Sequence, residues 1–321
     1  MAEIMKLFPA GKDYLWGGTR LRDEFGKKIN LIPLAETWEC SVHPDGPSVV
    51  ENGEFSGHTL AEVLKAHPEY MGSKMRGQKE LPVLIKFIDA KKDLSVQVHP
   101  DDEYARLHEN QNGKTEMWYV VDADKDANLI YGFAHEVNKD ILADAVKTGT
   151  LGKHLQKIKV KKGDVYFVPA GVVHGLGAGI LVAEIQENSN VTYRVYDYDR
   201  TDKNGKKREL HFDKAVEVMQ MEAAANVQQR GRMVHYEPGC SREILCRCKY
   251  FETERIRVKQ GLSFDVLDES FQVLLCLNGE GGIEGGDHPA VRFKKGDCLF
   301  LPASLGKCLL LGETEVLKVR C

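Results

Sequence analysis

One segment of this chain occurs twice, and the repeat limits what the chain can fold into. Residues 163–174 read GDVYFVPAGVVH and residues 296–307 read GDCLFLPASLGK, and two lysines precede each copy. Both copies have the pattern of a turn, a β-strand, a second turn and another strand. The sequence therefore predicts two related β-modules that follow each other along the chain.

The rest of the chain has many more strand-like segments than helical ones. Runs of apolar and β-branched residues, separated by Gly, Asp, Asn and Pro turn signals, occur at 82–88, 117–121, 165–168, 180–185 and 192–196. Helical spacing occurs only at 59–66, 101–109, 138–147 and 213–223, and Asp213 has the character of an N-cap. This pattern is typical of a mainly β protein, a barrel or a sandwich, with a few short helices.

The composition excludes several classes of function. The net charge of −4 over 321 residues argues against a protein that binds nucleic acid through a broad basic surface. No apolar run approaches the roughly 20 residues that a membrane helix needs, and the first residues, MAEIMK, do not resemble a signal peptide. The eight cysteines lack the paired spacing of a disulfide framework. We therefore expect a cytoplasmic protein without nucleic-acid or membrane partners, and the sequence does not indicate its oligomeric state.

Potential metal ligands are concentrated in three segments of the first module. In the run LSVQVH, Ser95, Gln97 and His99 are two residues apart, so on a strand their side chains point to one face. Glu116 begins a later apolar run, and His174 ends the first copy of the repeat. Two histidines, a carboxylate and an amide oxygen can hold a divalent metal with room for a substrate. The sequence therefore predicts metal-assisted chemistry.

The second module lacks the corresponding donors. Lys307 stands where the first copy has His174, and Phe271 stands where the first module has Glu116. A protonated lysine repels a cation, and phenylalanine has no donor atom. We expect residues 1–233 to form a catalytic metal-binding domain and residues 234–321 to form a degenerate second domain without a metal site.

These motifs together resemble a known family. The element KKGD…PAGVVH is similar to the second motif of the cupin barrels. Four motifs in order resemble the type I mannose-6-phosphate isomerases: LSVQVHPDD at 94–102, GKTEMWY at 113–119, GDVYFVPAGVVH at 163–174 and EIQENSNVTYRVYDYDR at 184–200. Long members of this family have a large helical insertion. Only residues 138–155 occupy its place in this chain, which therefore resembles the short bacterial form. The resemblance implies two cupin-type jelly-roll barrels in tandem, one Zn²⁺ per chain and a sugar phosphate substrate.

The resemblance also implies roles for individual residues. It places the zinc ligands at the four candidate positions above and the active-site residues at Arg194 and Lys114. It matches Ser95 and Lys86 to residues that meet the phosphate end of the substrate, and it leaves open whether Arg200 enters the site. Without the resemblance, Lys114 would be read as a solvated turn residue and Arg194 as a structural partner of Asp197 or Asp199.

The expected chemistry moves a proton between C1 and C2 of an aldose or ketose through an enediolate. Zinc can polarise the carbonyl group, and Arg194 can stabilise the developing negative charge. Arginine stays protonated, so it cannot be the base; Lys114 is the candidate, with a zinc-bound water or another acidic residue as alternatives. Polar residues at every second position support a cavity wall rather than a packed core: Glu184, Gln186, Asn188, Asn190, Thr192 and Arg194.

Two other classes of function fit parts of the same pattern. Two histidines and a carboxylate also form the facial triad of non-haem Fe(II) oxygenases. A double cupin could also bind sugars without catalysis. Gln97 as a fourth ligand and the basic residues near the site favour the isomerase, and the intact ligands of the first module argue against a protein without activity.

Overall fold

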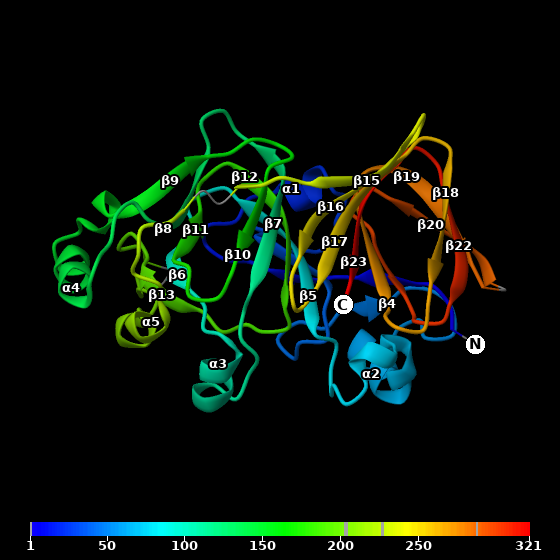
Figure 1. Cartoon of the computed structure of the whole chain (residues 1–321), viewed down its shortest axis with the longest axis horizontal. Helices are drawn as coiled ribbons and strands as arrows, with labels where there is room; N and C mark the ends of the chain where they lie inside the picture. Colours follow the sequence, from blue (N-terminus) through cyan, green and yellow to red (C-terminus); the bar gives the residue numbers. More distant parts are fainter. Residues whose placement is uncertain (1, 202–204, 226–227, 287) are drawn as a thin grey trace.

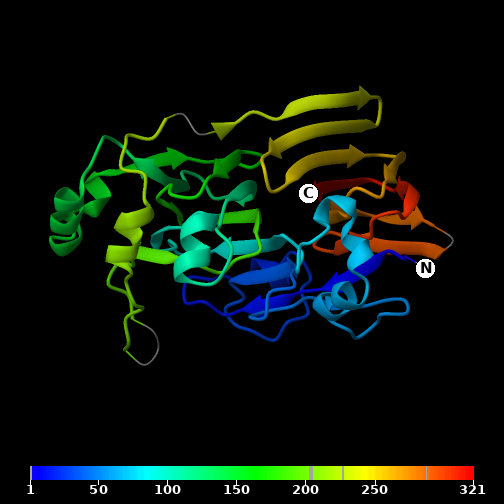
Figure 2. The same ribbon diagram turned by 60° about the horizontal axis from the view of Figure 1, so that its bottom comes forward.

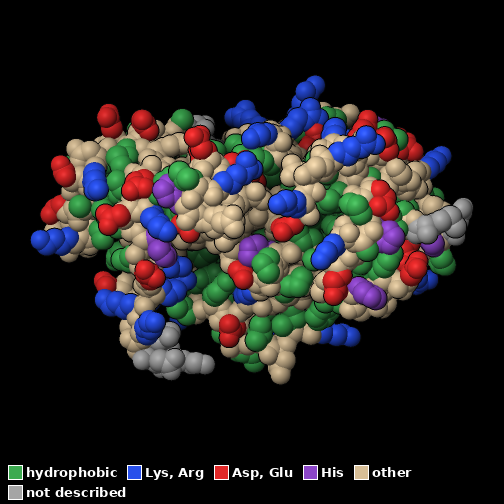
Figure 3. Space-filling view, turned by 90° about the horizontal axis from the view of Figure 1, so that it is seen from below, with side chains coloured by type: hydrophobic (Ala, Val, Ile, Leu, Met, Phe, Trp, Pro, Cys, Tyr) green, Lys and Arg blue, Asp and Glu red, His purple; other side chains and the backbone are tan. Residues whose placement is uncertain are grey.

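The structure is a computed structural model that describes residues 2–201, 205–225, 228–286 and 288–321. It consists of two β-modules side by side, with short helices at their edges (Figure 1). The predicted fold class, mainly β with jelly-roll modules, is confirmed. Figure 3 shows acidic and basic side chains interspersed over one face of the molecule, without a broad basic area there.

The first module is built from two sheets that pack face to face. Apolar side chains from both sheets, including Trp118, Val120, Tyr131 and Leu176, form one buried cluster between them. The seven-stranded sheet has the order β14 (Gln228–Gln229), β10 (Val165–Val168), β7 (Glu116–Ala123), β12 (Ile180–Glu187), β5 (Val83–Ala90), β3 (Glu36–Cys40) and β2 (Ala10–Lys12). The five-stranded sheet has the order β13 (Tyr193–Tyr196), β6 (Val96–Val98), β11 (His174–Leu176), β8 (Asn128–Phe133) and β9 (Leu155–Lys159).

The second module is an eleven-stranded sheet that folds over itself. Figure 2 shows its strands β15, β16 and β17 running antiparallel along one side of the molecule. Its main path is β15 (Arg232–Glu237), β16 (Cys240–Arg247), β17 (Glu252–Val258), β23 (Thr314–Arg320), β19 (Gln272–Gly285), β21 (Cys298–Leu301), β1 (Met5–Phe8) and β4 (Val49–Val50). The remaining strands of this sheet are β18 (Gly261–Val266), β20 (His288–Lys294) and β22 (Gly306–Leu311).

The N-terminal segment connects the two modules. Strand β1 pairs with β21, with Met5 opposite Phe300, so the start of the chain completes the sheet of the second module. A shared apolar core lies between the modules, where Phe87 and Met117 of the first module join Phe271 and Phe300 of the second. The two modules are therefore joined by a common apolar core, beside the separate clusters inside each module.

The α-helices of the described residues are α1 (Arg20–Asp23), α2 (Leu60–Ala66), α3 (Asp102–His108), α4 (Lys139–Lys147) and α5 (Phe212–Val218). Helices α2 to α5 lie close to the predicted positions, whereas the short α1 was not predicted. Helix α2 begins with a capping box, in which the Thr59 hydroxyl accepts from the Glu62 N–H and the Glu62 carboxylate accepts from the Thr59 N–H. None of the described helices is long and apolar enough to cross a membrane.

The prediction for the last helix was wrong at both ends. His211, not Asp213, is the N-cap of α5, and the helix ends at Val218 rather than at residue 223. Met219 takes an extended conformation, and the Gln220 N–H then donates to the carbonyl of Gly171. The chain leaves the helix because contacts with the turn before His174 replace the next intrahelical hydrogen bonds.

Candidate active site

The predicted metal ligands come together inside the first module from both of its sheets. Gln97 lies on β6 and pairs with His174, the first residue of the neighbouring strand β11. His99 follows β6, and Glu116 begins β7 in the opposing sheet. His99, Glu116 and His174 are all buried, and they form a cluster whose donor atoms lie within 4.8 Å of one another.

The cluster is compact enough to hold one ion. The His99 Nε2 atom lies 3.1 Å from His174 Nε2 and 3.6 Å from Glu116 Oε2, and His174 Nε2 lies 3.4 Å from Glu116 Oε1. The Gln97 amide nitrogen lies 3.4 Å from His174 Nε2, while its oxygen accepts from the Ser95 hydroxyl at 3.3 Å. The amide oxygen would be the metal ligand, so the Gln97 amide group would have to rotate by about 180° to exchange its nitrogen and oxygen.

Backbone carbonyls orient both imidazoles. Nδ1 of His99 is 2.9 Å from the carbonyl of Val191, and Nδ1 of His174 is 2.8 Å from the carbonyl of Val172. Each ring therefore donates through Nδ1 and directs the lone pair of Nε2 into the cluster. Burial and then the charge of Lys114 lower the pKa of His99 and lower that of His174 to about 4, so both rings are neutral, as metal ligands must be.

The donor set fits a divalent cation. Two neutral imidazoles that face each other through lone pairs cannot hydrogen-bond to each other, and Glu116 Oε1 has no hydrogen-bond partner among the described residues. The Lys114 ammonium group contacts Glu116 Oε2 and lies 3.0 Å from His99 Nε2, so a positive group already sits against two of the donors. Burial, followed by the charge of Glu184, raises the pKa of Glu116 to about 7, and a bound cation would favour its ionised form.

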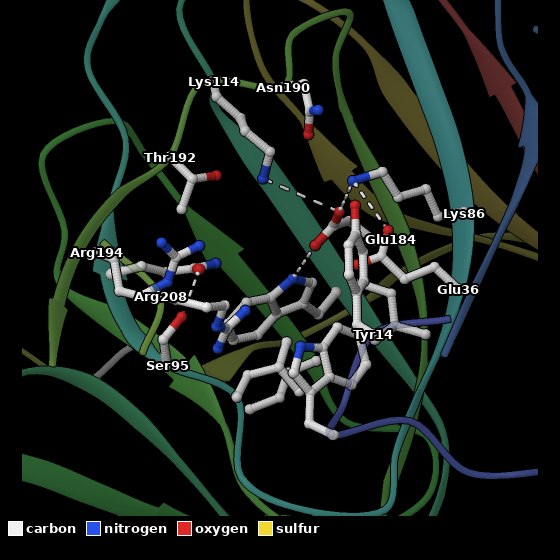
Figure 4. Close-up of a pocket in the computed structure, with 16 residues that line it drawn as sticks. Tyr14, Glu36, Lys86, Ser95, Lys114, Glu184, Asn190, Thr192, Arg194 and Arg208 are labelled. Atoms are coloured by element: carbon white, nitrogen blue, oxygen red, sulfur yellow. Dashed lines mark hydrogen bonds and ion pairs between the residues drawn. The ribbon is translucent and has the colours of Figure 1, made fainter. Parts of the chain in front are cut away.

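A polar cavity of about 240 Å³ opens beside the cluster (Figure 4). Lys114 lies at its wall and is only 4% exposed, so it is not a solvated turn residue. The lining residues include Tyr14, Trp16, Glu36, Lys86, Ser95, Gln97, Lys114, Trp118, Glu184, Asn190, Thr192, Arg194 and Arg208. Ser95 and Lys86 both line the cavity, from opposite sides.

One side of the cavity carries a buried cluster of lysines and carboxylates. The Lys86 ammonium lies 3.1 Å from Glu184 Oε1 and 3.8 Å from Glu36 Oε2, and the indole of Trp118 donates to Glu184 at 2.8 Å. Burial opposes the charge of Lys86, but Glu184 and Glu36 outweigh it and raise the lysine's pKa. Burial also opposes the charge of Glu184, but Lys114 and Lys86 lower that carboxyl's pKa to about 2. On this side of the cavity the charges of Lys86 and Glu184 therefore compensate each other.

The opposite side carries arginines. Arg194 on β13 donates from Nη1 to the carbonyl of Glu209 at 2.8 Å and does not pair with Asp197 or Asp199. Asp197 instead binds Arg200 and Arg208. Arg208 lines the cavity and Arg200 does not. The sequence had left open whether Arg200 enters the site.

The predicted polar wall is only partly correct. Glu184, Asn190, Thr192 and Arg194 line the cavity, whereas Gln186 and Asn188 do not. The amide nitrogen of Gln186 donates to the carbonyls of Glu187 and Ser189, both at 2.7 Å. Strand β12 ends at Glu187, so the two-residue alternation stops there.

Sequence reasoning missed Arg208, Glu36 and Tyr14 as residues of the cavity. Arg208 belongs to the polar run GKKR, which has the composition of a solvated loop, and only its return toward Asp197 brings it to the site. Glu36 and Tyr14 lie in the N-terminal segment, outside the four motifs to which site roles were assigned; the resemblance includes Glu36 in the run ETW but gives it no role.

The positions in the second module that correspond to ligands have other roles. Phe271 is fully buried and stacks on Phe300 with ring centroids 5.3 Å apart, while Lys307 is exposed. Among the described residues, one further group could hold a metal, His235, Glu237 and Cys240 on the β15–β16 hairpin. Its histidine and glutamate are exposed, and it does not correspond to the site of the first module.

The jelly-roll fold and the buried metal-donor cluster beside a polar cavity define the cupin class of proteins. Family models match the chain in two places: the catalytic domain of type I phosphomannose isomerase at residues 4–128, and the cupin domain of mannose-6-phosphate isomerase at residues 242–321. The chain is 41% identical to the mannose-6-phosphate isomerase ManA of Bacillus subtilis over 310 residues, which are 96% of this chain and 95% of that protein. It is 37% identical to the mannose-6-phosphate isomerase of Streptococcus mutans over 319 residues, which are 99% and 98% of the two chains.

The structural comparison agrees. The crystal structure of the mannose 6-phosphate isomerase from Bacillus subtilis superposes with a TM-score of 0.91 at 36% identity and covers 99% of both chains. The chain therefore belongs to the type I mannose-6-phosphate isomerase family, and it is an enzyme of the isomerase class. The family predicted from the sequence motifs is confirmed.

Proposed function

We propose that this chain interconverts D-mannose 6-phosphate and D-fructose 6-phosphate through an enediolate, with one Zn²⁺ per chain. The observation that carries the proposal is one cavity that combines the buried His99, Glu116 and His174 cluster with an arginine wall. A metal held by the cluster would polarise the carbonyl group of the substrate, and the arginines would bind an anionic group of the substrate.

The metal would be held by Gln97, His99, Glu116 and His174. When bound, Zn²⁺ would act as a Lewis acid toward the carbonyl and hydroxyl oxygens at C1 and C2. Four ligands with a single carboxylate leave the site with a net charge near +1, which favours a negatively charged intermediate.

The side chains around the cavity would then move the proton and stabilise charge. Lys114 is positioned beside two metal ligands, and we assign it the transfer of the proton between C1 and C2. Glu184 is the alternative acidic residue, because it is buried, ionised and part of the cavity wall. Arg194 would stabilise the enediolate oxygen, since its Nε is buried and makes no hydrogen bond to the described residues.

The substrate would lie between the two charged sides of the cavity. Ser95 lies on the arginine side and would contact the phosphate end. The charge of Lys86 is already balanced by Glu184 and Glu36, so Lys86 would serve the sugar end rather than bind the phosphate alone.

We also propose a division of labour between the modules. Residues 1–233 would carry the catalytic site, although their strands β1 and β4 belong to the sheet of the second module. Residues 234–321 would support the site without binding metal, and the apolar environment of Phe271 and the exposed Lys307 support this division. All eight cysteines are free thiols, which supports a reducing compartment such as the cytoplasm.

The test combines metal analysis with an isomerase assay on the full chain. His99→Ala and His174→Ala should each lose zinc and activity together, whereas the exposed His58→Ala should keep both. Zinc analysis and formation of fructose 6-phosphate from mannose 6-phosphate measure the two quantities. Full zinc occupancy in the first two variants would refute the ligand assignment, and iron with oxygen consumption would favour the oxygenase alternative.

A further inference from the structure

Among the residues that the structure describes, the arginine side of the cavity has more cationic than anionic side chains. Arg194, Arg200 and Arg208 surround Asp197, the acidic residue that binds two of them. The opposite side contains Lys86 and Lys114 with three carboxylates, Glu36, Glu116 and Glu184. The arginine side therefore offers a dianion cationic donors, whereas the lysines opposite are already paired with carboxylates.

Arg208 is held in a geometry that leaves donors free. Its Nε and Nη2 donate to the two carboxylate oxygens of Asp197 at 2.8 and 2.6 Å. This bidentate pair uses one edge of the planar guanidinium group, and Nη1 has no acceptor among the described residues. Asp197 thus positions Arg208 with donors available at the cavity wall.

Arg194 presents a second guanidinium group next to the first. One of its amino groups is used by the carbonyl of Glu209, and its buried Nε lacks a partner in the described parts of the chain. Burial, and then the positive charge of Arg208, lower the pKa of Arg194, and both guanidinium groups line the cavity. An anion bound to Arg208 would reduce this repulsion and leave Arg194 available for the reacting end of the sugar.

We propose that Arg208, positioned by Asp197, is a substrate-binding residue that binds the phosphate group of the hexose phosphate. This inference rests on the proposed function, because it assumes a phosphorylated sugar in the cavity. It assigns recognition of the phosphate to a residue of the 205–208 segment, outside the motifs that mark the active site in the sequence.

Arg200 provides a matched comparison. It also binds Asp197, but its Nη1 donates to the carbonyl of Asp93 and its Nε to the carbonyl of Asp197, and it does not line the cavity. Replacing either arginine leaves Asp197 with the other one as a partner. Each substitution therefore removes one positive charge beside Asp197, but only Arg208→Gln removes hydrogen-bond donors from the cavity.

The experiment measures KM for mannose 6-phosphate, competitive inhibition by inorganic phosphate and metal content in wild type, Arg208→Gln and Arg200→Gln. Loss of a charged hydrogen bond should raise KM and the phosphate inhibition constant roughly 10- to 100-fold in Arg208→Gln. Arg200→Gln should stay close to wild type, and all three proteins should bind equal metal. Arg208→Lys should give an intermediate KM, because it keeps the charge but loses the planar fork.

The possible results separate this inference from the proposed function. If wild type is active and Arg208→Gln keeps its KM and its sensitivity to phosphate, the role of Arg208 is refuted. Equal effects of Arg208→Gln and Arg200→Gln would also refute it, since they would indicate a general loss of charge. If wild type does not convert mannose 6-phosphate, the proposed function fails, and calorimetric binding of inorganic phosphate to the same variants still tests the role of Arg208.

Discussion

Replacing Phe271 by alanine tests whether the former ligand position of the second module has become part of the core. Phe271 is 0% exposed, lies in the core shared by the two modules and stacks on Phe300 with an angle of 14° between the rings. Truncation of a buried phenylalanine costs about 3–5 kcal/mol, of which an aromatic pair accounts for about 0.5–1.5 kcal/mol. We expect a loss within the upper part of that range, because packed residues of both modules surround the side chain.

The assay is urea unfolding followed by tryptophan fluorescence, with the metal content and kcat of the folded variant measured in parallel. Phe271→Ala should unfold at lower urea yet keep its metal and kcat, because the residue does not line the cavity. Lys307→Ala is the control: the side chain is exposed, so its effect should stay within about 0.5 kcal/mol. A loss below about 1 kcal/mol for Phe271→Ala, or loss of a bound metal, would refute the reasoning.

Three further predictions concern the catalytic module. Arg194→Ala should lower kcat about 10²- to 10³-fold and leave the metal content unchanged; a near-normal kcat would exclude its electrostatic role. Lys114→Met should lower kcat and remove one limb of the pH–rate profile, and an unchanged profile would indicate another base. Burial, with Asp102 adding to it, raises the pKa of Glu187 from 4.5 to about 7, so the folded state holds this proton more tightly than the unfolded state. The free energy of unfolding should therefore fall by about 3 kcal/mol as pH rises from about 4.5 to 7. Glu187→Gln, which can still accept from the Thr115 N–H, should not show this loss when unfolding is compared at pH 5 and pH 8.

Local sequence patterns predicted most of the secondary structure. All five predicted strand runs are strands, because short runs of apolar and β-branched residues between turn signals favour strands, and β5 and β12 are buried along their whole length. Three of the four predicted helices match α2, α3 and α4 closely, and each of these has a side chain that caps its first turn. Helix α5 differs because the contact of Gln220 with Gly171, which is distant in the sequence, ends it early.

The candidate metal site was visible in the sequence because each ligand stands in a motif whose local structure orients it. Gln97 and His99 are two residues apart, and Glu116 and His174 each begin a strand. The repeat also showed which module lacks donors, since Phe271 and Lys307 replace two of them.

Tertiary structure alone decided which charged residues meet in the cavity. Arg200 and Arg208 have similar sequence surroundings, yet only Arg208 lines the cavity, because the chain returns to Asp197 after residue 205. Strand β1 likewise joins the second module, although it lies nearly 300 residues from its partner β21. The sequence by itself determined the strands, the donor set and the family, because these depend on neighbours along the chain. Side-chain placement across the cavity depends on which distant segments pack together, and no local periodicity records that choice.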